Sequence, residues 1–253
     1  MTAEPNPELE AAAAALAGME ESIILRLIDR AQFRLNALIY EEGRSGFERD
    51  PGSSLFLLRL RAQEEMDSLF GRYKAPEERP FHRKLPAPAR GYVPGGPPLK
   101  IADYDLVNLS PRVVERYLEL VPRICLPGYD GQYGSSVELD IFAVQTIARR
   151  IHYGAFHIAE AKYRAAPARY REMIEAEDRE AILRELTRPE VEERVFARVR
   201  EKAEKLQSGS DPRVRVLAPP VAVEDFYRST VIPLTKEGEV LYLLARGRDE
   251  PRL

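Results

Sequence analysis

The sequence contains one cysteine, three histidines and no tryptophan in 253 residues. A single cysteine, Cys125, excludes an internal disulfide framework and is typical of a reducing compartment. His82, His152 and His157 show no spacing with cysteines or acidic clusters that would suit a metal ion. His152 and His157 are five residues apart rather than four, so they form a poor metal-binding face on a helix. We therefore expect no metal and no other cofactor.

Long apolar runs and nucleotide-binding glycine motifs are also missing. Nothing approaches the 18 or so consecutive apolar residues of a membrane span, and the N-terminal MTAEPNPELE does not resemble a signal peptide. The motifs GxGxxG, GxxxxGK[ST] and GxSxG do not occur in the context that they need. The formal charge is −3, with both signs interspersed. We therefore expect a cytoplasmic protein that binds neither nucleic acid nor membrane.

Apolar residues recur at three- and four-residue spacings along most of the chain, which predicts helices. Strand-like alternation is almost absent, and its one candidate, Arg213–Leu217, is followed closely by two prolines. The pattern predicts an all-α fold, a single-domain bundle over residues 1–253. The predicted helices cover residues 8–39, 54–72, 111–122, 136–164, 167–186, 189–206 and 221–246.

Three polar or proline-rich segments interrupt this helical pattern. Residues 74–110 contain a proline-dense extended connector, because proline fixes φ and removes a backbone donor. Residues 127–136 are rich in glycine and end in serines suited to capping the next helix. Residues 207–212 form a short polar break. These connectors are isolated, which favours one domain over two.

Polar and charged residues occur at four-residue intervals in two segments of the chain. Thr235 and Glu239 are four residues apart and therefore face the same way, as do Arg188 and Glu192. A set of surface ion pairs on capped helices would explain these intervals without any function.

Seven short sequences change that interpretation when they are taken together. They lie in one order along residues 19–246 and resemble the eukaryotic, all-helical chorismate mutases. The resemblance implies an all-α homodimer, regulated in many members by aromatic amino acids, that rearranges chorismate to prephenate without a cofactor. The sequences are RAQF (30–33), APEERPF (75–81), GYDGQYGS (128–135), RRIHYG (149–154), AEAKY (159–163), EVEERV (190–195) and VIPLTKEGEV (231–240).

The resemblance also assigns roles to five residues. It implies that Arg150 binds a substrate carboxylate and that Lys162 reaches the ether oxygen and a carboxylate. Glu192 would accept the substrate hydroxyl, and Thr235 would bind a carboxylate. Glu239, held protonated in a cleft with a raised pKa, would donate to the ether oxygen. Cations for two carboxylates and donors for the breaking ether bond suit a unimolecular rearrangement of a dianion.

The chain departs from the family pattern at two charged positions. The family has an arginine in the first helix, where this chain has Ala13. Loss of one charge partner costs about 2–5 kcal/mol, roughly thirtyfold to several-thousandfold in transition-state binding. Arg188 replaces an asparagine of the family one turn before Glu192, and Pro189 predicts a helix start there. We therefore predict that Arg188 lies at a helix N-terminus, reaches the cavity and binds substrate.

The spacing between Arg150 and Lys162 is one residue longer than the family's. On a regular helix twelve residues place the two side chains about 120° apart, whereas eleven would leave about 20°. The sequence therefore predicts a π-bulge or kink between Gly154 and Ile158, where the extra residue is absorbed.

The resemblance places an aromatic amino-acid effector at the dimer interface. Its residues here are Arg72, Gly134 and Ser135, and Gly71 occupies the second position of the family's basic pair. Half of that pair is therefore missing.

The leading hypothesis is an isomerase acting on chorismate or a close analogue. The alternative is a weak or inactive homologue that serves as a binding or dimerisation partner, which Ala13 and the inserted residue favour. An ordinary helical scaffold with neither role is the third possibility. Retention of Lys162, Glu192, Thr235 and Glu239 favours the enzyme.

Overall fold

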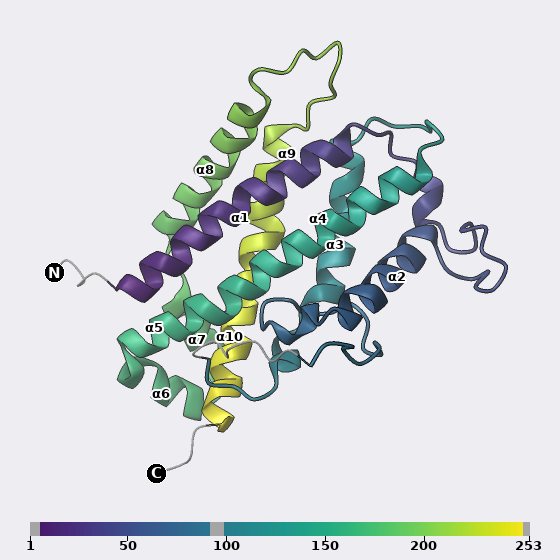
Figure 1. The fold of residues 1–253 in the computed structure, drawn as a ribbon. Helices are drawn as coiled ribbons and strands as arrows, with labels where there is room; N and C mark the ends of the chain where they lie inside the picture. The colour runs from purple at the N-terminus through teal and green to yellow at the C-terminus, as the bar shows by residue number, and fades with distance from the viewer. Residues whose placement is uncertain (1–5, 92–98, 250–253) are drawn as a thin grey trace.

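The computed structural model describes residues 6–91 and 99–249, and every regular element within these ranges is helical. The α-helix α1 lies against α4 and α8, and α10 packs behind them (Figure 1). The predicted all-α fold is confirmed. The α-helices are α1 (Pro7–Ala31), α2 (Leu55–Leu69), α3 (Ser110–Ile124), α4 (Tyr133–Tyr153), α5 (Ala159–Ala165), α6 (Pro167–Glu175), α7 (Arg179–Leu186), α8 (Pro189–Gln207), α9 (Pro220–Phe226) and α10 (Ile232–Asp249).

Short 3₁₀ and π segments lie between these helices. The 3₁₀ segments are η1 (Ala37–Tyr40), η2 (Arg72–Lys74) and η3 (Tyr104–Val107), and the π segments are η4 (Gly154–Ile158) and η5 (Tyr227–Val231). No helix in the described ranges is both long and apolar enough to cross a membrane.

Helix α1 ends earlier than the predicted residue 39, because tertiary bonds compete with helix continuation. Asn36 takes a left-handed conformation with φ 50°, and its side-chain amide donates to Asp130 and Ser136. The guanidinium of the fully buried Arg30 donates to the carbonyls of residues 33, 34 and 35, which lie past the helix end. Arg30 also pairs with buried Asp140 at 2.7 Å. The RAQF sequence therefore ends the helix.

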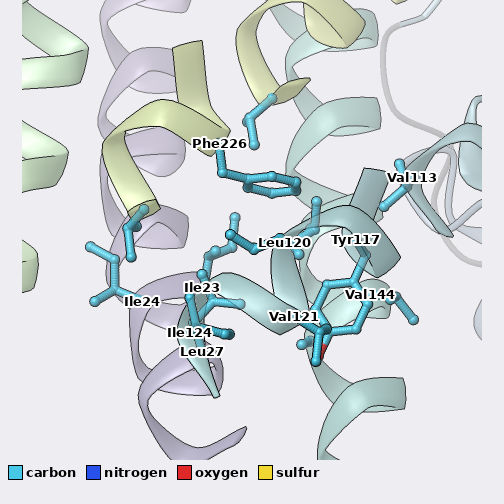
Figure 2. Close-up of a cluster of buried hydrophobic side chains, with 14 of the residues drawn as sticks. Ile23, Ile24, Leu27, Val113, Tyr117, Leu120, Val121, Ile124, Val144 and Phe226 are labelled. Atoms are coloured by element: carbon cyan, nitrogen blue, oxygen red, sulfur yellow. The ribbon is translucent and has the colours of Figure 1, made fainter. Parts of the chain in front are cut away.

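The main core lies where α1, α3, α4 and α9 meet (Figure 2). Apolar residues of α1 at three- and four-residue spacings, including Ile23, Ile24 and Leu27, are fully buried there. Phe226 of α9 and Tyr117 of α3 pack into the same cluster, and the Tyr117 hydroxyl donates to Asp140. Full burial of such a side chain stabilises the fold by about 1.5–3 kcal/mol.

Two smaller predictions are wrong. The segment 167–186 is two helices, because the chain reverses at Glu177 with φ 49°. Residues 213–217, the one strand candidate, form turn and coil, in agreement with the all-α prediction. The serines of the glycine-rich loop do not cap α4, because the helix starts at Tyr133 and Ser136 instead accepts a bond from Asn36.

The described parts of the proline-rich connector follow the prediction. Residues 75–91 and 99–109 contain no α-helix, and η3 is the short helical turn among them. Buried Arg79 fixes the loop by donating to the carbonyls of residues 73, 75 and 76 and to Asp105. Residues 92–98 of the predicted connector lie outside the described residues.

The predicted π-bulge between Gly154 and Ile158 is confirmed: η4 spans those five residues and joins α4 to α5 without a break. Close packing also requires glycine here. A Cβ on Gly154 would lie 2.6 Å from Cγ2 of Thr235, and one on Gly238 would lie 2.5 Å from Cβ of Ala155. The two glycines therefore allow α10 to approach η4 closely.

Candidate functional site

Four of the predicted site residues meet where α4, η4 and α5 pack against α10. Arg150 donates from Nη1 to Oγ1 of Thr235 at 2.7 Å. Lys162 pairs with Glu239 through Nζ and Oε2 at 2.8 Å. Arg150, Thr235 and Glu239 are each no more than 5% exposed. The η4 turn absorbs one residue between Arg150 and Lys162, so the two cations face the same helix, α10.

Arg150 is a buried cation with few partners. Among the described residues, Thr235 is the one hydrogen-bond acceptor of its guanidinium, and Nε is buried without a partner. Burial lowers the pKa of Arg150, although an arginine remains charged in proteins. A buried guanidinium with unused donors is suited to a carboxylate ligand.

Glu239 combines a cationic partner with deep burial. Burial raises the pKa of Glu239, and this effect outweighs the lowering by Lys162 and Arg150. Lys162 also donates to the carbonyl of Leu186 at 3.1 Å, so the end of α7 holds its ammonium group in place. The burial and raised pKa agree with the prediction for Glu239, and a protonated carboxyl group here is a hydrogen-bond donor.

Glu192 lies at the edge of this cluster, in the first turn of α8. Its carboxylate accepts bonds from Nζ of Lys236 at 2.9 and 3.2 Å, and both side chains are 22% exposed. Lys236 follows Thr235 on α10, and its charge also lowers the pKa of Glu239. Sequence reasoning missed Lys236, although it lies inside the VIPLTKEGEV sequence.

Arg188 occupies the N-cap position of α8, so its predicted place at a helix N-terminus is confirmed. The predicted contact with the cluster is not found. The guanidinium instead donates to the carbonyls of Glu185 and Thr187 and to Oε1 of Glu185, and the side chain is 49% exposed. The carbonyls at the end of α7 need donors, and Arg188 supplies one to Glu185, as the Thr187 hydroxyl does to Leu183.

A second buried charge near Arg150 was missed in the sequence. Glu20 of α1 is fully buried and accepts two bonds from Arg198, with Nε at 2.8 Å, and Lys202 forms a second ion pair with it. Arg150 lies within electrostatic range of both Glu20 and Arg198. Ala13, two turns earlier on α1, is exposed. Ala13 does not contribute to the cluster. The charge of Glu20 is balanced by Arg198 and Lys202 of α8.

The predicted effector residues are separated within one chain. Gly134 and Ser135 lie in the first turn of α4, whereas Arg72 bonds to Gln145 further along the same helix at 2.9 Å. Eleven residues of helix place Gln145 about 16 Å from Gly134. Arg72 is also paired with Asp67 and Glu78. One chain alone does not bring the three predicted effector residues together.

The described ranges give no indication of a metal site. No group of three or more acidic, histidine or cysteine side chains is placed to hold a metal ion there. His152 is instead a core residue, since it donates from Nδ1 to the Ala148 carbonyl and accepts from the Leu109 amide.

Comparison with known proteins gives full-length matches. The chorismate mutase of Schizosaccharomyces pombe is 41% identical over 250 residues, which cover 94% of this chain and 96% of the relative. The chain belongs to the chorismate mutase family. No family model matches the sequence.

Two solved chorismate mutases share the fold. The Candida albicans enzyme, solved in complex with L-Trp, has a TM-score of 0.88 and 31% identity, and the match covers 98% of this chain and 96% of that one. The chloroplast chorismate mutase of Zea mays has a TM-score of 0.81 and 33% identity, with 96% of each chain covered. This chain therefore has the all-helical architecture of the chorismate mutases.

Proposed function

We propose that this chain is an isomerase that rearranges chorismate to prephenate, a step of aromatic amino-acid biosynthesis. The observation that supports it most is the buried cluster at η4. There a π-turn directs Arg150 and Lys162 toward Thr235 and Glu239 of α10. The reaction is unimolecular, so the protein has to fold the dianion into a reactive conformation and stabilise the charge that develops on the ether oxygen.

The contacts support a division of roles within the cluster. Arg150, with Thr235 on one of its nitrogens, has unused donors for a substrate carboxylate. Lys162 and Glu239 are already 2.8 Å apart, so an ether oxygen beside them would meet one cation and one neutral acid. Glu192, the most exposed acid of the set, would accept the substrate hydroxyl at the edge of the site. Arrangement of these groups before the reaction stabilises the transition state more than the ground state.

Glu239→Gln should change the pH dependence of the rate. The carboxyl group donates only when protonated, so wild-type kcat should fall as pH rises through its raised pKa. A glutamine amide donates at every pH, so the variant should show a flat profile and become faster than the wild type at alkaline pH. Steady-state rates of chorismate loss between about pH 4 and 9 test this, and with it the proposed function.

Glu237→Gln is the matched control for this test. Glu237 lies two residues before Glu239 on α10 and pairs with Arg112 at the surface. Its variant should keep the wild-type pH profile. An unchanged profile in Glu239→Gln as well would remove Glu239 from the reaction.

Arg188 stays a predicted substrate-binding residue, although it is bonded to Glu185 in this structure. If it binds substrate, Arg188→Ala should raise KM severalfold, and Ala13→Arg in that background should restore part of the loss. The comparison of KM in the three proteins tests the prediction. An unchanged KM would leave Arg188 with the role that the structure shows, a donor to the end of α7.

We also propose that two copies of the chain form a homodimer through the outer face of α2. Ala62, Met66 and Leu69 share one exposed face of that helix, and Phe70, directly after it, is 70% exposed. We propose that Gly134 and Ser135 of one chain lie near Arg72 of the other in this dimer, since one chain alone keeps them apart. An aromatic amino-acid effector would then bind between the two copies.

The double variant Met66→Glu, Phe70→Asp should convert this dimer to a monomer, because two charges of one sign would be buried at the interface. Sedimentation velocity of the variant and the wild type measures the change. Val214→Asp is the control, since Val214 is 86% exposed in the loop between α8 and α9. A wild-type protein that sediments as one chain would contradict the proposal.

A cytosolic location, indicated by the single buried cysteine, also remains a proposal.

A further inference from the structure

The second π-turn, η5, brings a tyrosine onto the face of α10 that forms the site. Helices α9 and α10 are continuous through η5, which begins at Tyr227. Tyr227 precedes Thr235 by eight residues, so a regular helix would place the two side chains about 80° apart. The extra residue of a π-turn reduces that angle to about 20°. Tyr227, Thr235 and Glu239 therefore line one side of the continuous helix.

Contacts with Arg150 agree with that alignment. Nη1 of Arg150 donates to Thr235, and its guanidinium carbon lies 5.7 Å from the centroid of the Tyr227 ring. This distance is within the range of a cation–π interaction. One guanidinium from α4 thus contacts two residues of the α9–α10 segment that only the π-turn places on the same face.

Two buried polar atoms of Arg150 and Tyr227 have no hydrogen-bond partner, which points to a ligand. In the described ranges, the buried side-chain nitrogen and oxygen atoms without a hydrogen-bond partner are Nε of Arg150 and the hydroxyl of Tyr227. Tyr227 is fully buried and Arg150 is 3% exposed. A buried unsatisfied donor is costly, and native proteins contain few of them. Here both belong to neighbouring side chains in the candidate site.

The charges around Tyr227 leave its hydroxyl available as a donor. Glu20, an acid that acts on it, already accepts two bonds from Arg198 and pairs with Lys202. Burial raises the pKa of Tyr227 above its usual value, and Arg150 lowers it by less. The phenol is therefore neutral at physiological pH and has one hydrogen available to donate.

We propose that Tyr227 is a substrate-binding residue: its hydroxyl and Nε of Arg150 together donate to one carboxylate of the bound dianion. The inference rests on the proposed function and adds a residue to the site. Both donors are buried before the ligand arrives, so the carboxylate exchanges its water shell for groups already in place. A neutral donor here also strengthens carboxylate binding in a site whose first helix has alanine at position 13.

Tyr227→Phe tests the proposal, because it removes the hydroxyl and keeps the ring against Arg150. The variant loses a hydrogen bond to a carboxylate in both the ground state and the transition state. Its KM should therefore rise about 10- to 100-fold with little change in kcat. The melting temperature of the free protein should stay the same or rise, since a buried unsatisfied group is gone. Steady-state kinetics with chorismate and thermal unfolding without it give the two readouts.

Tyr117→Phe is the matched control. Tyr117 is also fully buried, but its hydroxyl donates to Asp140 at 2.7 Å in the core. That variant should melt at a lower temperature and keep the wild-type KM where it remains folded. The two tyrosines should therefore give opposite results in the two assays.

The outcomes separate this inference from the proposed function. A wild-type protein that turns over chorismate with an unchanged KM in Tyr227→Phe would overturn the inference alone. A wild-type protein without turnover would overturn the proposed function. Calorimetric titration with prephenate, itself a dicarboxylate, would then decide on Tyr227. Weaker binding to Tyr227→Phe than to wild type would support the contact, and equal binding or none would overturn it.

Discussion

Replacing Arg150 with methionine should lower kcat/KM for chorismate by about thirtyfold to several thousandfold. The variant leaves a substrate carboxylate without its buried cation, a loss of about 2–5 kcal/mol. Folding should not suffer. Arg150 is desolvated, has one hydrogen bond to Thr235 and leaves Nε unsatisfied, so an apolar side chain of similar length fits the same space at no loss. Steady-state kinetics and thermal unfolding of the same preparation measure both effects.

Arg149→Met is the control for that experiment. Arg149 precedes Arg150 on α4 but is 49% exposed and pairs with Glu78 at 3.4 Å. Its replacement should leave kcat/KM within about twofold, because surface ion pairs contribute little. Equal effects of the two variants, or no effect of Arg150→Met, would exclude Arg150 as the carboxylate ligand.

Replacing Lys162 with methionine should reduce kcat by about a hundred- to a thousandfold, the usual effect of removing one preorganised donor to a developing oxyanion. Lys162 is one of two groups assigned to the ether oxygen, and its loss also removes the ammonium group that lies 2.8 Å from Glu239. Because Lys162 lowers the pKa of Glu239, residual activity should persist to higher pH than in the wild type.

The comparison variant is Lys205→Met, on the exposed last turn of α8. Lys205 pairs with Glu201 at the surface, and its side chain is 73% exposed. We expect wild-type kcat and an unchanged pH profile. A Lys162→Met protein with near wild-type kcat would contradict the assignment of the ether oxygen to Lys162 and Glu239.

The first π-turn, η4, could be predicted from the sequence. Arg150 and Lys162 belong to one site only if a residue is absorbed between them, and η4 absorbs it at the predicted place. That prediction worked because helical geometry fixes side-chain direction once the interval is known. The second π-turn, η5, was not predicted, since no pair of residues with known roles spans it.

Other features depended on contacts that spacing does not reveal. Glu20 and Arg198 are charged residues on helices and look like surface residues in the sequence, yet Glu20 is fully buried between α1 and α8. Arg188 was expected to reach the cluster, but the nearby carbonyls at the end of α7 bind it instead. Local donors and acceptors compete with long-range contacts, and a sequence alone does not show which prevails. The single-domain organisation over residues 1–253 likewise remains a prediction.

The cluster at η4 should rearrange chorismate although position 13 holds alanine. The most direct test is to mix the purified wild-type protein with chorismate and follow the loss of the diene absorbance, with the product identified by proton NMR. We expect saturable, enzyme-dependent formation of prephenate, strongly reduced in Arg150→Met. Conversion no faster than in buffer alone, from a protein shown to be folded, would exclude this cluster as a chorismate mutase site.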